Sequence, residues 1–192
     1  MCNQQFLDNL SVILKSGILN NLNFGYYTED EFNRSSISCR SKFSVFHVNI
    51  RSLNKNHWQL TNFLSQLRIS FDVIVLSEIW NYNLEFYNNL FDGYKFVYIT
   101  PETSLVGGVG MYIKNEYSFT ILDKFRIPSS NANRVDNLWV EIYDNKFKCI
   151  IGGIYRHPNQ NFDDFSKLLE PILNVISSND VRTVHHCWRP KY

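Results

Sequence analysis

Glu78 is the residue whose position most clearly suggests chemistry, because a carboxylate here directly follows an apolar run. Five of the six residues at 71–76 are apolar and most are β-branched, which is typical of a short strand buried on both faces. A glutamate at the end of such a strand must be neutralised, paired with a cation or exposed to water. Glu78 therefore either lies in water where the sheet ends or binds a metal ion.

Asn49 closes a second predicted strand at residues 43–50. Between the two strands, apolar residues recur at the spacing i, i+3, i+4 and i+7 and predict a helix with Asn54 or Asn56 as its N-cap; they are Leu60, Phe63, Leu64 and Leu67. A strand–helix–strand unit joins parallel strands, whose C-terminal ends share one edge of the sheet. We therefore expect Asn49 beside Glu78, an oxygen-rich pair that a hard cation prefers.

Tyr155 ends the second strand of a predicted antiparallel hairpin. The hairpin is indicated by alternating apolar residues at 138–142 and 147–155, with turn-forming residues at Asp144 and Asn145. A tyrosine at the end of a strand is either an aromatic residue at the rim of the core or a functional group.

The glycine-rich segment at residues 107–110 runs directly into a predicted strand. A phosphate-binding glycine loop must instead be followed by a helix, whose N-terminus faces the phosphate. Close approach of the backbone in a bent strand is therefore the better interpretation of these glycines.

Further strands are predicted at residues 94–100 and 117–126, and a final helix is predicted after Asn161, its N-cap. Pro171 lies inside this helix and predicts a kink, or two helices that meet at Glu170.

The domain organisation predicted from these patterns is a loosely ordered leader at 1–40, one domain at 41–178 and an irregular tail at 179–192. We place His185, His186 and Cys187 in the tail, because adjacent side chains point in different directions and suit no common zinc site.

The composition limits the class of protein. With 192 residues and 44% hydrophobic content, the chain can build one globular domain, and its net charge of +1 provides no overall basic field for nucleic acid. The four cysteines form no C-x-x-C pair, which favours reduced thiols inside a cell. No apolar stretch approaches the roughly 18 residues of a membrane-spanning helix, so we expect no membrane insertion.

Four motifs in chain order resemble the first half of an endonuclease/exonuclease/phosphatase domain, in particular the apurinic-like endonuclease of non-LTR retrotransposons. They are residues 43–54 (FSVFHVNIRSLN), 71–80 (FDVIVLSEIW), 107–114 (GGVGMYIK) and 153–158 (GIYRHP). The resemblance covers residues 43–176. It implies an α/β fold, the first half of a four-layer αββα sandwich, with mixed sheets and flanking helices.

The resemblance also implies a Mg²⁺-dependent hydrolase that cuts phosphodiesters in DNA and works in the nucleus. Glu78 would be the metal ligand, Asn49 would orient the metal-bound phosphate, and Tyr155 would contact the phosphate in the transition state. These residue types suit that chemistry, because Mg²⁺ neutralises charge on phosphate oxygens while an amide and a phenol supply directed hydrogen bonds.

The chain also departs from the family, which carries a Gly-Asp-x-Asn strand and a terminal Ser-Asp-His in its second half. Neither motif occurs in this sequence. We therefore expect a truncated, inactive endonuclease domain. One alternative is a non-catalytic α/β fragment that binds nucleic acid or a partner chain and can self-associate through an uncovered sheet face. Another is an intact enzyme of the same superfamily that acts on a different phosphoester and whose second half is lost to a gene-model error.

Overall fold

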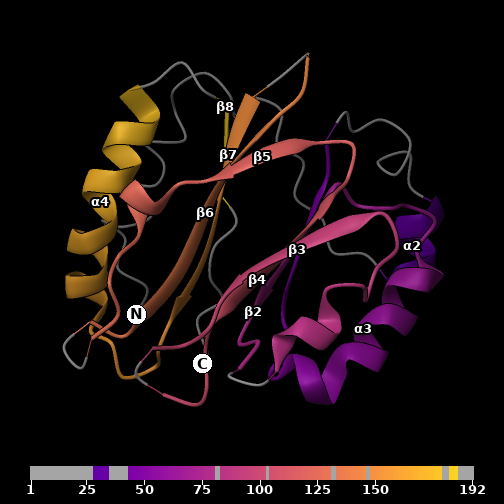
Figure 1. Ribbon diagram of the computed structural model, residues 1–192, viewed down its shortest axis with the longest axis horizontal. Coiled ribbons are helices and arrows are strands. Elements are labelled where there is room, and N and C mark those ends of the chain that lie inside the picture. The colour runs from indigo at the N-terminus through magenta and orange to yellow at the C-terminus, as the bar shows by residue number, and fades with distance from the viewer. Residues whose placement is uncertain are drawn as a thin grey trace.

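The computed structural model describes residues 28–34, 43–80, 83–102, 104–130, 133–145 and 148–178, together with the backbone of 182–185. Two four-stranded sheets pack face to face, and a helix lies on the outer side of each (Figure 1). The four layers are helix, sheet, sheet and helix. The predicted mixed α/β sandwich is therefore confirmed.

The first sheet has the strand order β1-β2-β4-β3. Its strands are β1 (Val45–Asn49), β2 (Val73–Ser77), β3 (Tyr94–Ile99) and β4 (Val109–Lys114). β1 and β2 run parallel and are joined by α3 (Leu53–Gln66), as the strand–helix–strand pattern predicts, whereas β4 pairs antiparallel with β2 and with β3. The C-terminal ends of β1 and β2 therefore share one edge.

The N-cap of α3 is Ser52, and the prediction of Asn54 or Asn56 is wrong. Ser52 has non-helical backbone angles, and its side-chain oxygen accepts a hydrogen bond from the backbone nitrogen of Lys55 at 3.4 Å. The helix thus begins earlier than predicted. Asn56 lies in its first turn and donates its side-chain NH₂ to the carbonyl of Ile50 at 2.7 Å.

The second sheet has the strand order β5-β6-β7-β8. Its strands are β5 (Ser118–Ile121), β6 (Val135–Tyr143), β7 (Lys148–Arg156) and β8 (Arg182–His185). The β6–β7 hairpin is antiparallel as predicted. β5 is shorter than predicted, because the short 3-10 helix η3 (Asp123–Phe125) follows it.

Strand β8 corrects the prediction of an irregular tail at 179–192 for residues 182–185 alone, because 179–181 and 186–192 lie outside the described part of the chain. Arg182–His185 pair in parallel with β7 along Cys149–Gly152, and α4 (Phe162–Ser178) forms the crossover between the two strands. The parallel crossover supplies backbone partners that the local sequence does not reveal. His186 and Cys187 lie outside the described residues.

Helix α4 runs through Pro171 without a break, so the prediction of two helices meeting at Glu170 is wrong. Its N-cap is as predicted, since the side-chain oxygen of Asn161 accepts from the backbone nitrogens of Asp163 at 2.8 Å and Asp164 at 3.2 Å. Burial of the apolar face of α4 against the second sheet offsets the local cost of the proline.

Part of the predicted leader is ordered. Helix α2 (Glu29–Arg34) packs against the first sheet, with the ring of Phe32 stacked 6.4 Å from that of Phe71. Asn33 also donates its side-chain NH₂ to the carbonyl of Gln66 at 2.9 Å. The prediction of a loose leader is therefore wrong for 29–34, while residues 1–27 and 35–42 lie outside the described part of the chain.

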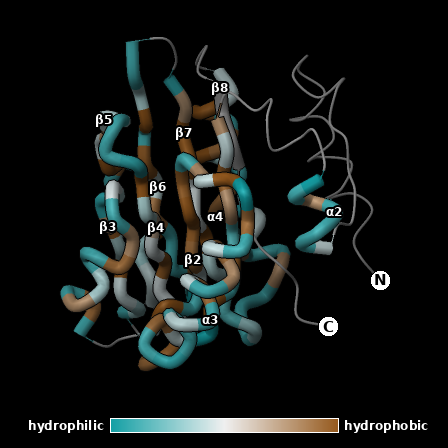
Figure 2. The backbone as a smooth tube through the Cα atoms, turned by 90° about the vertical axis from the view of Figure 1, so that its right-hand side faces the viewer, coloured by the Kyte–Doolittle hydropathy of each residue, from teal (hydrophilic) through white to brown (hydrophobic). Residues whose placement is uncertain are grey.

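Apolar residues fill the three interfaces between these layers, one between the two sheets and one beneath each outer helix. Figure 2 shows hydrophobic residues concentrated along β2 and β7. The inner cluster includes Val75, Met111, Val140 and Ile151. Leu60 of α3 and Phe165 of α4 belong to the two outer clusters, so both outer faces carry a helix and the predicted uncovered sheet face is not found among the described residues. No helix in these ranges has the length and apolar character needed to cross a membrane.

Candidate active site at the shared edge of the two sheets

Three strands bring the predicted site residues together. Asn49 is the last residue of β1, Glu78 directly follows β2, and Tyr155 is next to last in β7. The side-chain nitrogen of Asn49 donates a hydrogen bond to Oε1 of Glu78 at 2.7 Å, and the phenol of Tyr155 hydrogen-bonds the same carboxylate. The predicted contact between Asn49 and Glu78 is therefore confirmed, and Tyr155 joins it from the opposite sheet.

The amide of Asn49 is held in one orientation. Its oxygen accepts a hydrogen bond from the backbone nitrogen of Arg51 at 3.2 Å, which leaves the NH₂ group for Glu78. Asn49 thus donates to the carboxylate rather than adding a second oxygen beside it. Its direct effect on Glu78 is to position one carboxylate oxygen.

Glu78 is buried, with only 4% of the residue exposed. Its backbone nitrogen donates to the carbonyl of Gly108 at 3.0 Å, and its own carbonyl accepts from the backbone nitrogen of Ser52 at 2.7 Å. The interpretation that Glu78 lies in water at the end of the sheet is therefore wrong. A carboxylate this buried needs hydrogen bonds or a cation to remain ionised.

Unusual backbone conformations gather at this edge. Among the described residues, the non-glycine positions with positive φ are Arg51, Ser52, Glu78 and Trp80, at 48°, 90°, 57° and 65°. Such conformations cost about 1–3 kcal/mol each and persist only where the surrounding structure enforces them. Because these residues lie at or near Glu78, the backbone at this edge is locally strained and is held in place by the surrounding structure.

The phenol of Tyr155 is held in its protonated form. Burial raises the pKa of this group, and the nearby charges of Glu78 and Asp136 raise it further, while Arg156 lowers it. A protonated phenol donates a hydrogen bond, here to Glu78. A phenol in this state is a hydrogen-bond donor and not an acid near neutral pH.

Asp136 is a buried acid that is not among the predicted site residues. It lies on β6 directly opposite Tyr155, and its Oδ2 accepts a hydrogen bond from the backbone nitrogen of Gly108 at 2.8 Å. Nε2 of His157 lies 3.1 Å from the same oxygen, and the His157 ring meets that of Tyr155 edge to face at 4.8 Å. Asp136 thus links the loop after β7 to the glycine turn that contacts Glu78.

The predicted hairpin contains information that could have identified Asp136 as a candidate site residue. In the register between β6 and β7, residue 136 lies opposite Tyr155, and a hairpin with turn-forming residues at Asp144 and Asn145 is expected to set that register. Aspartate is also depleted in strands, so its presence there invites an explanation. The bond to Gly108 could not be anticipated, because it crosses between the two sheets.

Glu78 suits a metal ion that keeps most of its water. The described residues contain no group of three or more His, Cys, Asp and Glu side chains that could hold a metal. Mg²⁺ commonly binds proteins through one or two carboxylates, with waters and substrate phosphates completing its octahedron. One buried carboxylate between an amide and a phenol fits that pattern, whereas a protein-enclosed zinc site would need more ligands.

Comparisons with known proteins find similarity in structure alone. No protein-family profile and no curated protein sequence matches the chain. The endonuclease domain of TRAS1, a telomere-specific non-LTR retrotransposon, superimposes with a TM-score of 0.51 and 10% identity, over 74% of this chain and 58% of that one. D. rerio TDP2 complexed with a single-strand DNA product gives a TM-score of 0.55 and 15% identity, over 76% and 59%.

A third solved structure bears the family name in its description. The endonuclease/exonuclease/phosphatase family protein from Bacteroides thetaiotaomicron gives a TM-score of 0.54 and 8% identity, over 74% of this chain and 60% of that one. The chain thus spans about three fifths of the length of these structures, and identities this low show a shared fold. Over about three quarters of its length, this chain has an endonuclease/exonuclease/phosphatase-like fold.

Proposed function

We propose that this chain carries one half of the site of a Mg²⁺-dependent DNA endonuclease of retrotransposon origin. The observation that carries the proposal is the meeting of Asn49, Glu78 and Tyr155, from three strands of two sheets, around one buried carboxylate. The enzymes of this reaction class hydrolyse phosphodiesters. Access to chromosomal DNA would place a functional protein in the nucleus.

Each residue has a distinct role in the proposed site. Glu78 would anchor the cation through its carboxylate, and Asn49 would keep that carboxylate in place and help to orient the phosphate. Tyr155 would donate a hydrogen bond from its phenolic O–H to a phosphate oxygen as negative charge develops there. Bound Mg²⁺ would supply charge neutralisation at the phosphate.

Two of the structural neighbours support this choice of substrate and origin. The TRAS1 domain is an endonuclease from a non-LTR retrotransposon, and the D. rerio TDP2 structure contains a single-strand DNA product. Both share the fold with this chain. DNA is therefore the partner that we propose for the site around Glu78.

We further propose that the chain with this sequence is a poor catalyst. It contains neither the Gly-Asp-x-Asn nor the Ser-Asp-His motif, which supply the water-activating and acid–base groups of the family. Catalytic groups act as a unit, and removing one member of such a unit costs several orders of magnitude in rate. Weak cation binding and very slow cutting are the expected behaviour. The same absence favours the second candidate function, a non-catalytic domain that binds nucleic acid.

Terbium luminescence tests the metal site directly. Tb³⁺ replaces hard divalent cations, and its emission rises when it binds near an aromatic ring such as that of Tyr155. We expect emission that Mg²⁺ competes away and that Glu78→Gln abolishes. Glu85→Gln is the matched control, because Glu85 is an exposed carboxylate. If Glu78→Gln and Glu85→Gln bound terbium equally, Glu78 would not be the metal ligand.

Plasmid nicking tests the catalytic half of the proposal. Supercoiled plasmid incubated with the purified chain and Mg²⁺ should remain largely intact. Rapid nicking that Glu78→Ala abolishes would refute the proposed inactivity while supporting the endonuclease site. Intact plasmid together with no terbium binding at Glu78 would favour the non-catalytic candidate.

A further inference from the structure

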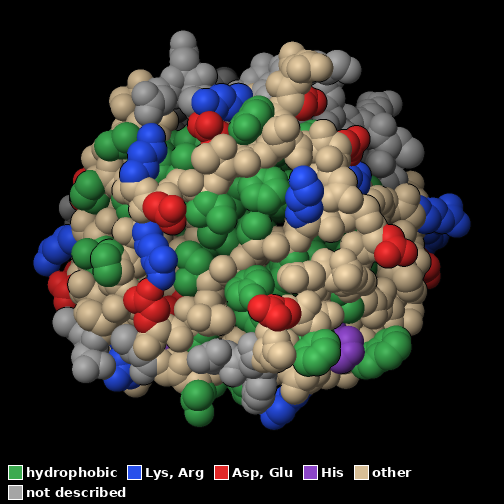
Figure 3. All heavy atoms as spheres, in the orientation of Figure 1, with side chains coloured by type: hydrophobic (Ala, Val, Ile, Leu, Met, Phe, Trp, Pro, Cys, Tyr) green, Lys and Arg blue, Asp and Glu red, His purple; other side chains and the backbone are tan. Residues whose placement is uncertain are grey.

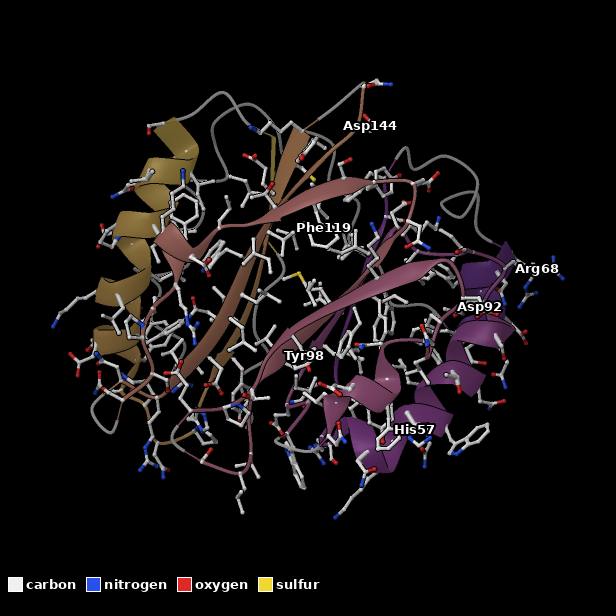
Figure 4. The ribbon with its side chains drawn as sticks, in the orientation of Figure 1. His57, Arg68, Asp92, Tyr98, Phe119 and Asp144 are labelled. Atoms are coloured by element: carbon white, nitrogen blue, oxygen red, sulfur yellow. The ribbon has the colours of Figure 1, made fainter. Side chains whose placement is uncertain are left out.

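A strip of aromatic rings, one exposed and two half-buried, lies next to the proposed site. Trp58 on α3 is 73% exposed, which is far more than a core residue would show. The ring of His57 lies 5.6 Å from that of Trp58 and 5.3 Å from that of Tyr87, the last residue of the 3-10 helix η2 (Leu84–Tyr87). Figure 3 shows a histidine between two hydrophobic side chains on this face, and Figure 4 labels His57 there. We call Trp58, His57 and Tyr87 the aromatic strip.

Hydrogen bonds hold the aromatic strip in place. The hydroxyl of Tyr87 donates to Oδ1 of Asn54 at 2.7 Å, and Nδ1 of His57 lies 3.2 Å from the carbonyl of the same residue. Asn54 thus fastens η2 to the first turn of α3. Two of the three rings are therefore held before any ligand arrives, which reduces the entropy lost on binding.

The aromatic strip begins close to Glu78. The backbone nitrogens of Ser52 and Leu53 donate to the carbonyls of Glu78 at 2.7 Å and Ile79 at 3.1 Å, so the start of α3 is bonded to the turn that carries the carboxylate. Lys55, one helical turn before Trp58, places its ammonium 5.4 Å from the ring centre of Trp80. A ligand on the strip would therefore extend toward the site.

The charge around the strip favours an anion. Lys55 and Arg51 are exposed at the start of α3, against one exposed acid in η2, Glu85. A polyanion that carries planar aromatic groups can bind these cations through its charges while the planar groups stack on the rings. A protein partner would instead favour a broad apolar surface with few charges at its centre.

We propose that the aromatic strip binds unpaired bases of a single-stranded nucleic acid whose backbone passes Glu78. Bases in a duplex already stack on one another. Bases of a single strand are free to stack on aromatic side chains, whatever the nucleotide sequence. The inference rests on the proposed function, because it states that the nucleic acid bound at the proposed site is single-stranded. It adds the region of α3 and η2 to that site.

Binding of a fluorescent oligothymidylate, measured by anisotropy in EDTA, tests the inference. We expect the single strand to bind more tightly than a duplex of the same length, and Trp58→Ala to weaken single-strand binding by about tenfold, since one stacked base contributes that much. Trp58→Phe should retain most of the affinity. Lys55→Gln should reduce the slope of log K against log salt by about 0.7.

Tyr143→Ala is the matched control, because Tyr143 is an exposed aromatic next to Asp144 at the opposite end of the molecule (Figure 4). Its affinity should equal that of the unmodified chain. Three results would each overturn the inference. They are equal affinity for single strand and duplex, a single-strand affinity that Trp58→Ala leaves unchanged, and a loss of affinity in Tyr143→Ala equal to that in Trp58→Ala. Oligonucleotide binding is measured without metal and terbium binding without DNA, so the two proposals can fail separately.

Discussion

Asp136 and Gly108 join the two sheets through one buried hydrogen bond, in which the backbone nitrogen of Gly108 donates to Oδ2 of Asp136 at 2.8 Å. The carbonyl of Gly108 in turn accepts from the backbone nitrogen of Glu78. The position of the candidate metal ligand therefore depends on an acid from the opposite sheet.

Asp136→Asn should lower the free energy of unfolding by about 1–3 kcal/mol, because hydrogen bonds to a charged acceptor are stronger than those to a neutral one. The change replaces a buried carboxylate that both Gly108 and His157 contact. Urea denaturation measures the difference. Asp92→Asn, at an exposed carboxylate, should stay within about 0.5 kcal/mol of the unmodified chain, and equal losses in the two variants would contradict this role for Asp136.

Gly108→Ala and Gly93→Ala separate backbone strain from crowding. Both glycines have positive φ, 76° and 81°, but a Cβ at Gly108 would lie 2.9 Å from the carbonyl oxygen of Ile99, whereas one at Gly93 would meet nothing within 4 Å. We expect Gly93→Ala to destabilise by about 1 kcal/mol and Gly108→Ala by about 2–4 kcal/mol. Thermal melting checks this order, and a Gly93→Ala variant that is the less stable of the two would show it to be wrong.

Asn49→Ala should weaken terbium binding by about 10–100-fold, the usual cost of losing a group that orients a metal ligand. The variant removes the donor that lies 2.7 Å from Glu78 Oε1. Asn88→Ala, at an exposed amide after η2, serves as the control and should bind terbium normally. Unchanged affinity in Asn49→Ala would mean that Glu78 does not need this bond.

Acid should destabilise the fold partly through Asp72. Burial alone would raise the pKa of Asp72, but hydrogen bonds from Ser44 and Lys114 outweigh it and hold the pKa below its usual value. The carboxyl group therefore contributes stability above its unfolded pKa of about 3.9, and this stability is lost as the pH falls through the lower folded value. Asp72→Asn should flatten the acid limb of a stability–pH curve, whereas a parallel shift of the whole curve would argue against this linkage.

Cys149 should react slowly with alkylating reagents in the folded chain. Burial raises the pKa of its thiol to about 12, so almost no thiolate exists near neutral pH. Iodoacetamide treatment followed by peptide mass mapping should leave Cys149 unmodified until denaturant is added. Rapid labelling under native conditions would show that β7 opens readily.

The periodicity of the sequence predicted much of the first sheet and the hairpin. The apolar run before Glu78 and the amphipathic helix implied two parallel strands, and alternating residues implied β6 and β7, because these patterns depend on local side-chain direction. Strand β8 was not predicted, because it pairs with residues of β7 that lie more than 30 positions earlier in the chain. The N-cap at Ser52 was not predicted either; its backbone, with a φ of 90°, is bonded to the carbonyl of Glu78, a contact that the local sequence does not reveal.

The sequence by itself determined that Asn49 and Glu78 would meet, because parallel strands joined by one helix must end at the same edge. Only the tertiary structure decided that Glu78 is buried, that Tyr155 reaches it and that Asp136 supports the turn beside it. These contacts cross between the two sheets. No local pattern encodes how one sheet packs on the other, since that arrangement follows from the burial of both apolar faces at once.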